Sequence, residues 1–236
     1  MEKIIRIENI NKRYKDNIIF NNFQIDFYEN KINCILGKSG CGKTTLLNII
    51  SGVVKNDESD FKGIEDLGVS YIFQDDRLID WLSVEDNIKL VIKKHYDEAK
   101  VNELCEKYLK LVGIYEYKNY YPQRLSGGMR QRVNIARAFI YPSKIIIMDE
   151  PFKSIDIKNK QIIMENFKKI LEEDNRTVLF VTHDIDEALY LGDVAFILGD
   201  RPLKIKNIFK EIKDTDKEKI SEYILYIIKN TPILIY

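Results

Sequence analysis

The 236-residue chain is long enough for one α/β domain with a full hydrophobic core, or for such a domain with a small additional lobe. Its 37 basic and 37 acidic residues cancel, whereas a protein that neutralises nucleic-acid phosphates usually carries a basic excess, so we expect no nucleic-acid partner. The sequence has no apolar run near the roughly 20 residues that span a bilayer, no signal peptide, and three cysteines without metal-ligand spacing, which together fit a reducing cytosol.

The first 36 residues indicate β structure. The segments IIRIEN and NFQIDFY alternate apolar with polar residues, which is typical of strands with one face in water. Residues 29–31 (ENK) are suited to a turn, and the short apolar segment INCIL that follows predicts another strand. The segment TTLLNIISG predicts a helix that ends at Gly52.

Between that strand and that helix, residues 37–44 (GKSGCGKT) fit the pattern G-x-x-x-x-G-K-[ST] in the context that it requires. Glycines let consecutive backbone N–H groups surround a phosphate, and the helix adds its positive N-terminal end. Lys43 supplies a charge for the β- and γ-phosphates, and the Thr44 hydroxyl can ligate Mg²⁺. We therefore predict a site for a nucleoside triphosphate and Mg²⁺ formed by Gly37, Lys38, Ser39, Gly40, Cys41, Gly42, Lys43, Thr44 and Thr45, and this loop alone leaves kinases, GTPases and motor ATPases open.

From Asp75 to about Tyr121 the sequence is helical and charged, as in SVEDNIKLVIKK and EAKVNELCEKYLKLVGI, and we interpret this part as a helical lobe. A further helix is predicted within RLSGGMRQRVNIARAF (124–139), where apolar residues recur every three or four positions: Met129, Val133, Ala136 and Phe139.

That helix would begin at two glycines, Gly127 and Gly128, each of which costs about 1 kcal/mol relative to alanine. Ser126 can cap the helix, and the glycines leave its first N–H groups uncovered. Such a helix end is suited to contact a phosphate at close range.

Two further apolar segments predict the strands of a parallel sheet. KIIIMDEP is apolar on both faces, as a central parallel strand should be. Asp149 at its end can hold Mg²⁺ through water, and Glu150 is placed as a general base for an attacking water. A helix at 158–173 leads to the second strand, TVLFVTHD, and this alternation favours a doubly wound α/β sheet.

The segment LSGGMRQRV, downstream of a P-loop, resembles the signature of ATP-binding-cassette (ABC) ATPases, and the resemblance extends from residue 4 to about 198. It implies a P-loop NTPase with a RecA-like parallel-sheet core, an N-terminal antiparallel β part and an inserted α-helical lobe. We expect one ABC ATPase domain over 1–236, with the core at 1–74 and 140–200, the lobe at 75–139 and a tail at 201–236.

The resemblance also implies the roles of single residues. In this family two domains pair head to tail, so the signature residues of one copy meet the γ-phosphate on the partner's P-loop; here they are Ser126, Gly127, Gly128 and Gln131. Tyr14 matches an aromatic that stacks on adenine, and Asp156 matches the aspartate of the loop that joins the two domains. The implied catalytic residues are Glu150, His183 and Gln74, and the implied metal residues are Thr44, Gln74 and Asp149.

The sequence departs from the family pattern at two places. Lys153 adds a charge near the expected dimer seam, where Ala or Gly commonly precedes Leu-Asp. The stretch between Gly52 and Gln74 is shorter than usual, so we expect its small antiparallel hairpin to be trimmed.

The segment QDDRLIDWLSVEDNI resembles its counterpart in importers of nitrate, sulfonate, taurine or thiamine-precursor pyrimidines. Trp81 and Asn87 match that subgroup, and Asp80 replaces the usual proline. Four apolar residues there have two open interpretations, the edge of a groove for a permease helix or packing inside the lobe: Leu78, Ile79, Trp81 and Leu82.

The resemblance therefore implies an ATP-hydrolysing subunit of a membrane transporter that imports a small solute. It would act as a homodimer, or paired with a second ATPase subunit, at the cytoplasmic face of the membrane. Its partners would be integral-membrane permease subunits docked at the helical lobe and an extracytoplasmic solute-binding protein. A soluble ABC ATPase of the cluster-assembly type is the alternative.

Overall fold

The computed structural model describes residues 3–58, 64, 68–173, 175–212 and 216–230. The chain forms two compact units, one from Met1–Val69 with Arg176–Tyr236 and one from Ser70–Asn175. The expected lobe, 75–139, lies inside the second unit, and its limits and those of the core and tail stay predictions. Within the described residues, no helix combines the length and apolar character needed to cross a bilayer.

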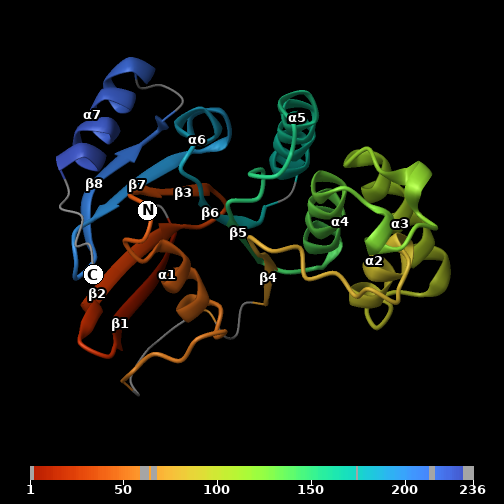
Figure 1. Ribbon diagram of the computed structural model, residues 1–236, viewed down its shortest axis with the longest axis horizontal. Coiled ribbons are helices and arrows are strands. Elements are labelled where there is room, and N and C mark those ends of the chain that lie inside the picture. Colours follow the sequence, from red (N-terminus) through yellow and green to blue (C-terminus); the bar gives the residue numbers. More distant parts are fainter. Residues whose placement is uncertain (1–2, 59–63, 65–67, 174, 213–215, 231–236) are drawn as a thin grey trace. The chain divides into compact units, whose positions relative to one another are not determined.

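The first unit begins with an antiparallel two-stranded ribbon (Figure 1). Strand β1 (Ile4–Tyr14) pairs with β2 (Asn17–Tyr28), and the register shifts three times along the second half of β1. The predicted strands are confirmed, because their apolar residues are buried on one face: Ile7, Ile10, Phe23, Ile25 and Phe27. A turn at residues 29–30 leads into the next strand.

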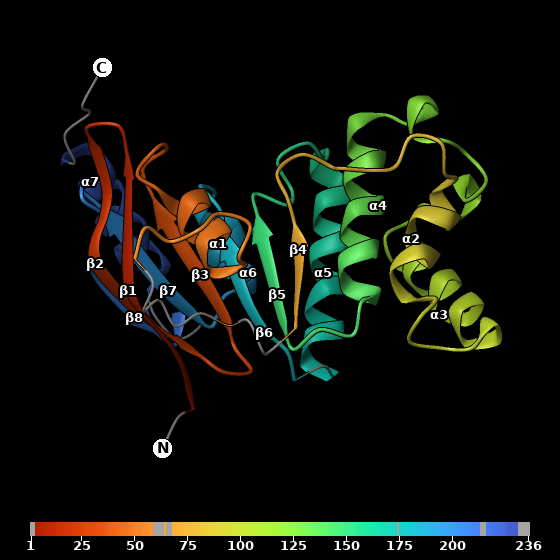
Figure 2. The ribbon, with the colours of Figure 1, turned by 90° about the horizontal axis from the view of Figure 1, so that it is seen from below.

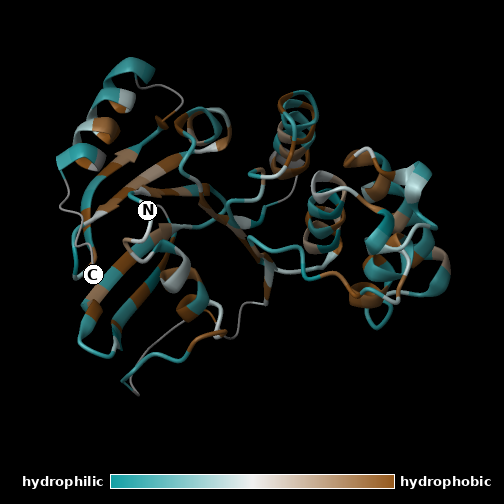
Figure 3. Ribbon diagram, viewed as in Figure 1, coloured by the Kyte–Doolittle hydropathy of each residue, from teal (hydrophilic) through white to brown (hydrophobic). Residues whose placement is uncertain are grey.

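Four hydrogen-bonded strands form the core of the first unit. Strand β3 (Ile32–Gly37) runs parallel to β6 (Thr177–Val181) on one side and to β7 (Val194–Gly199) on the other. Every residue of these three strands is buried, which explains why their sequences are apolar without alternation. They are accordingly among the most hydrophobic segments in Figure 3.

Helices cover both faces of this sheet (Figure 1). Helix α1 (Lys43–Ile50) lies with the β1–β2 ribbon on one face, and α6 (Ile185–Leu191) and α7 (Lys217–Asn230) lie on the other. The segment that we expected only as a tail thus contributes an edge strand, β8 (Lys204–Lys210), antiparallel to β7, and α7. Its half-buried and exposed residues alternate along β8, as is typical of an edge strand.

The second unit consists of two neighbouring strands and a set of helices (Figures 1 and 2). The strands are β4 (Val69–Ile72), which starts at the unit boundary, and β5 (Ile145–Asp149). The α-helices are α2 (Val84–Ile92), α3 (Glu98–Leu111), α4 (Gly127–Ile140) and α5 (Ile157–Glu173), and short 3-10 turns occupy Tyr115–Tyr117 and Pro122–Arg124.

Helix α4 is buried over a wider surface than the predicted stripe. Val133, Ala136 and Phe139 are buried, but so are other residues around the helix: Ile135, Ala138 and Ile140. The reason is that α4 packs between α2 and α3 on one side and α5 on the other (Figure 2). On the α5 side, the Phe139 ring meets Phe167 edge to face, with ring centroids 4.1 Å apart.

The expected trimming of the hairpin between Gly52 and Gln74 falls largely on residues 59–63 and 65–67, which lie outside the described residues.

Candidate functional site

The P-loop joins the end of β3 to the start of α1 in the first unit. Gly40 and Gly42 have φ angles of 75° and 120°, a backbone conformation that glycine adopts without steric cost. A Cβ at Gly42 would lie 2.9 Å from a methyl of Ile19, and a Cβ at Gly37 would lie 2.4 Å from the carbonyl oxygen of Leu198. The neighbouring strands β2 and β7 therefore leave no room for side chains at these positions.

The start of α1 is suited to an anion. Lys43 is buried, and its ammonium donates hydrogen bonds to the carbonyls of Gly37 (2.7 Å) and Lys38 (2.9 Å). Within the described residues, no side chain caps the N-terminus of α1, so the first N–H groups of the helix are open to a ligand. Thr44 is exposed beside them. An uncapped helix start, a lysine and an exposed hydroxyl fit a triphosphate with Mg²⁺.

Two features beside the P-loop could not be predicted from the sequence, namely a contact from Arg201 and the protonation of the Cys41 thiol. The Arg201 guanidinium donates to the carbonyl of Gly40, so it adds a positive charge next to the P-loop. Burial raises the pKa of the Cys41 thiol, and the nearby Lys43 opposes this shift only in part. Cys41 therefore contributes a small neutral side chain, not a reactive thiolate.

His183 lies at the same edge of the sheet as the P-loop. Strands β3 and β6 are parallel, and Ile35 stands opposite Val181. Two residues further along the chain are Gly37, the last residue of β3, and His183, which follows the end of β6 and has an exposed side chain. The structure thus brings His183 and the P-loop to one edge, as the resemblance requires.

The turn that carries His183 is fixed by its neighbours. Buried Thr182 donates from its hydroxyl to Glu187 (2.6 Å) and accepts from the backbone N–H of Asp184 (3.0 Å). The Asp184 carboxylate in turn caps α6 by accepting from the N–H groups of Asp186 and Glu187. These contacts hold the backbone on both sides of His183.

Tyr14, the predicted adenine-stacking residue, is the last residue of β1. Its side chain is 48% exposed, which leaves ring surface for a base. The ammonium of Lys12 lies 5.5 Å from the ring centroid, within the range of a cation–π contact.

In the second unit, the predicted metal ligand and general base stand at the end of β5. Asp149 is its last residue and is buried. Glu150 follows with φ of 47°, a left-handed conformation that is costly for a residue with a side chain. The Lys153 ammonium lies 3.0 Å from its carboxylate oxygen Oε2. The lysine that departs from the family pattern therefore pairs with the predicted base.

The two signature glycines differ in their surroundings. A Cβ at Gly128 would lie 3.0 Å from the carbonyl oxygen of Ser154, so the start of α4 packs tightly on the loop after β5. At Gly127, apart from its own helix and chain neighbours, no described atom lies within 4 Å of the same position. Ser126 caps α4, as predicted, by accepting from the N–H of Met129 (3.3 Å). Buried Gln131 donates to the carbonyl of Pro151 (2.9 Å) and ties α4 to the loop that carries Glu150.

Three polar side chains of α4 fasten residues 73–77, which include the exposed Gln74. Arg130 pairs with the Asp76 carboxylate (3.0 Å), and Arg137 donates to the carbonyls of Asp76 (3.0 Å) and Arg77 (2.9 Å). Asn134 donates to the carbonyl of Phe73 (3.2 Å). Both arginines are therefore engaged within their own unit. Only the spacing of Arg130 and Arg137, two turns apart on one helix face, could have indicated this.

The segment that resembles importer subunits forms a compact turn around Asn87. This buried side chain accepts from the N–H of Ile79 (2.8 Å) and donates to the carbonyls of Ile79, Leu82 and Ser83 (3.1, 3.1 and 3.0 Å). Trp81 at the tip is 79% exposed. Packing inside the lobe therefore does not account for Trp81, although Leu78, Ile79 and Leu82 are half-buried.

Asp156 stands at the start of α5. Its carboxylate accepts from the backbone N–H and the side-chain amide of Asn159 (3.1 and 2.7 Å), and the side-chain contact is the main reason why the pKa of Asp156 is lowered. In this chain Asp156 therefore caps α5. Its role in the loop that joins two paired domains stays a prediction.

The predicted site residues fall into two sets. The first unit carries Tyr14, residues 37–45 and His183, and the second carries Gln74, Ser126, Gly127, Gly128, Gln131, Asp149, Glu150 and Asp156. The functional roles of these residues stay predictions.

Comparison with known proteins gives the family. Residues 20–153 match the sequence profile of the ABC transporter family. The chain is 36% identical to an uncharacterised ABC transporter ATP-binding protein of Methanocaldococcus jannaschii, over 96% of this chain and 89% of that protein. It is 36% identical to the aliphatic sulfonates import ATP-binding protein SsuB 1 of Pseudomonas savastanoi pv. phaseolicola (85% and 83% covered). It is 39% identical to the nitrate import ATP-binding protein NrtD of Synechococcus elongatus (72% and 65% covered).

A solved structure agrees with these relatives. It is an ATP-binding cassette determined as a dimer in a post-hydrolysis state bound to ADP and Pi. It matches with a TM-score of 0.75 and 29% identity, over 87% of this chain and 98% of that one. The expected fold, a P-loop NTPase with a parallel-sheet core and an antiparallel β part, is thereby confirmed. The chain therefore belongs to the ABC transporter family, as an ATPase subunit.

Proposed function

We propose that the chain binds ATP with Mg²⁺ and hydrolyses it in a pair with a second copy, or with a related ATPase subunit, to drive a membrane importer of a small solute. One combination carries this proposal: an uncapped P-loop helix that starts with Lys43, and a second helix, α4, that starts behind Ser126 at a glycine with open surroundings. Both are helix ends that can receive phosphate oxygens.

The residues would divide the work as follows. The P-loop N–H groups, Lys43 and Thr44 would hold the triphosphate, and Asp149 and Gln74 would hold the metal ion. Bound Mg²⁺ would neutralise phosphate charge and orient the phosphate oxygens. Glu150 would accept the proton of the attacking water, and His183 would bind the γ-phosphate. Catalysis would come mainly from positioning and charge stabilisation.

The proposal that two ATPase chains pair is based on the surroundings of Gly127. A glycine that lowers helix stability and leaves open space is best explained by an occupant that approaches from outside the chain. The solved relative was determined as a dimer with ADP and Pi, which supports a second cassette as the source of that occupant.

The importer assignment is supported by the sulfonate and nitrate import relatives, and it includes solutes of the taurine and thiamine-precursor type. The exposed Trp81 is a candidate contact for a permease helix, because large exposed aromatics are typical of interface anchors. The chain would then lie at the cytoplasmic face of the membrane, with a solute-binding protein on the other side. The cluster-assembly alternative is not favoured by these relatives.

Replacement of the predicted base tests the proposal. We expect Glu150→Gln to bind ATP with unchanged affinity, to form a stable ATP-bound dimer, and to lose at least about 100-fold in kcat, since a general base typically contributes 10²–10⁴. Glu165→Gln is the matched control, because Glu165 is an exposed glutamate of the same unit. Turnover in Glu150→Gln close to that of the control would exclude Glu150 as the base, and failure of the wild type to bind ATP would exclude the proposed function.

A further inference from the structure

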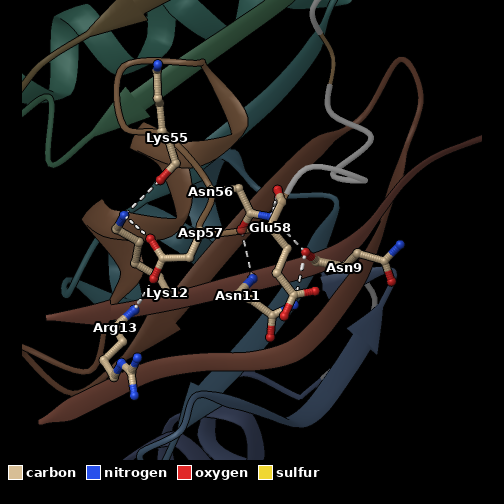
Figure 4. A network of polar contacts seen from close by, with 8 residues as sticks. All are labelled: Asn9, Asn11, Lys12, Arg13, Lys55, Asn56, Asp57 and Glu58. Carbon is tan, nitrogen blue, oxygen red and sulfur yellow. Dashed lines mark hydrogen bonds and ion pairs between the residues drawn. The ribbon is translucent and has the colours of Figure 1, made fainter.

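The C-terminal half of β1 is bonded along its outer edge to a short segment from elsewhere in the chain (Figure 4). The N–H of Asn11 donates to the Asn56 side chain (2.8 Å), and the N–H of Asp57 donates to the carbonyl of Asn11 (2.9 Å). The N–H of Arg13 donates to the Asp57 carboxylate (2.7 Å). These bonds involve residues 11–13 of β1, within the part of the strand where its register with β2 shifts.

The side chain of Lys12 adds two further bonds between β1 and the same segment. Its ammonium donates to the carbonyl of Lys55 (2.9 Å) and to the Asp57 carboxylate (2.5 Å). The Lys12 side chain is only 13% exposed, and its hydrogen bond is the main reason why the pKa of Asp57 is lowered. We call these six residues the polar latch: Asn11, Lys12, Arg13, Lys55, Asn56 and Asp57.

The polar latch joins two parts that a nucleotide would touch. On one side it ends next to Tyr14, whose ring centroid lies 5.5 Å from the Lys12 ammonium. On the other side, residues 55–57 follow α1, and the intervening chain is bonded to the last turn of α1 by Gly52 to Ile49 (3.0 Å) and Val54 to Asn48 (2.9 Å). Helix α1 has eight residues and is about 12 Å long, and it starts at Lys43. The latch therefore fixes the strand that carries Tyr14 to the far end of the phosphate-binding helix.

We infer that the polar latch, with Asp57 at its centre, positions Tyr14 for the nucleoside part of the bound nucleotide. This inference rests on the proposed function, because it takes ATP as the ligand of the P-loop. Asp57 and Lys12 do not touch the nucleotide and are positioning residues. They set where the Tyr14 ring stands relative to Lys43, so they affect base recognition and leave the phosphate site unchanged.

The test compares two ligands of the P-loop, ATP and inorganic tripolyphosphate, which lacks the nucleoside. We expect Asp57→Ala to raise the Kd of ATP roughly fivefold, a loss within the range of one stacked base, and to leave the Kd of tripolyphosphate unchanged. Retained tripolyphosphate binding also shows that the P-loop is folded. Lys12→Met should have the same effect, because it removes the charge that holds Asp57.

Asp26→Ala is the matched control. Asp26 forms an exposed ion pair with Arg6 on the same ribbon (2.8 and 2.9 Å) without a contact to residues 55–57 in the described structure. It should bind both ligands like the wild type.

A double-mutant cycle separates positioning from general stabilisation. If the latch acts through Tyr14, Asp57→Ala should add nothing to the effect of Tyr14→Ala on ATP binding. Additive effects, an equal loss of tripolyphosphate binding, or an unchanged Kd of ATP in Asp57→Ala would each overturn the inference. A wild-type chain that binds neither ligand would instead overturn the proposed function.

Discussion

At the scale of single residues, Gly127 and Gly128 show that adjacent glycines can be required for unrelated reasons. Gly128 is favoured by the fold, because a Cβ there would lie 3.0 Å from the carbonyl oxygen of Ser154 and would require the loop to shift. Gly127 is not, since an added methyl would meet open space within the described part of the chain. Its helix would even be favoured by alanine. A cost of substitution at Gly127 must therefore arise from something that the chain binds.

This difference gives a prediction. We expect Gly127→Ala to raise the unfolding free energy by up to about 1 kcal/mol and yet to lower ATP turnover, because the methyl group obstructs the incoming phosphate. Gly128→Ala should lower both, because it displaces the loop after β5. Urea unfolding and steady-state ATPase assays distinguish the two, and full turnover in Gly127→Ala would argue against a phosphate at this helix end.

Glu150 is a second residue whose local structure could not be read from the sequence. Its left-handed backbone and its ion pair with Lys153 are both features of a residue held in one position. The sequence indicated only that two acids follow a strand. It could not indicate the pairing, because that depends on the turn that the backbone makes at Glu150.

At the scale of elements, α4 joins the signature to residues 73–77. Arg137 is the centre of this junction, and burial lowers the pKa of its guanidinium, which Asp76 partly opposes. The guanidinium donates hydrogen bonds to two backbone carbonyls, which would lose these bonds without it.

We therefore predict that Arg137→Met lowers the unfolding free energy by about 2 kcal/mol, which is the usual range for loss of hydrogen bonds to a charged donor. Arg124→Met, at an exposed arginine near the start of the same region, should change it by no more than about 0.5 kcal/mol. Both are measured by urea unfolding followed by circular dichroism. Equal values for the two variants would show that the junction adds no stability.

The elements themselves were largely predictable, and the contacts between them were not. Continuous apolar runs predicted β3, β5 and β6, and Ser126 before two glycines predicted the start of α4, because these signals are local. The polar latch joins residues more than 40 positions apart and depends on register shifts in β1. The segment after Asp200 was missed because the apolar and polar residues of β8 do not alternate strictly: Asn207 takes a half-buried position and Ile208 an exposed one.

At the scale of the whole molecule, the proposal makes activity a property of a pair. If one copy completes the site of another, ATP turnover per chain should rise with protein concentration and reach a plateau when dimers predominate. We expect the rate to fall toward zero at dilutions where analytical ultracentrifugation detects only monomers.

Ser126→Arg provides the control for that prediction, since it places a bulky cation at the helix end. It should keep monomer ATP binding and lose pairing at all concentrations tested. Full turnover by a chain that stays monomeric would be incompatible with the proposed pair.

The fastening of residues 73–77 to α4 has a mechanical consequence. Arg130, Asn134 and Arg137 bond that segment along two turns of the helix, and α2, which follows the Trp81 turn, packs against the same helix. A displacement of the turn that carries Trp81 would therefore also displace α4, including Gly127 and Gly128 at its start.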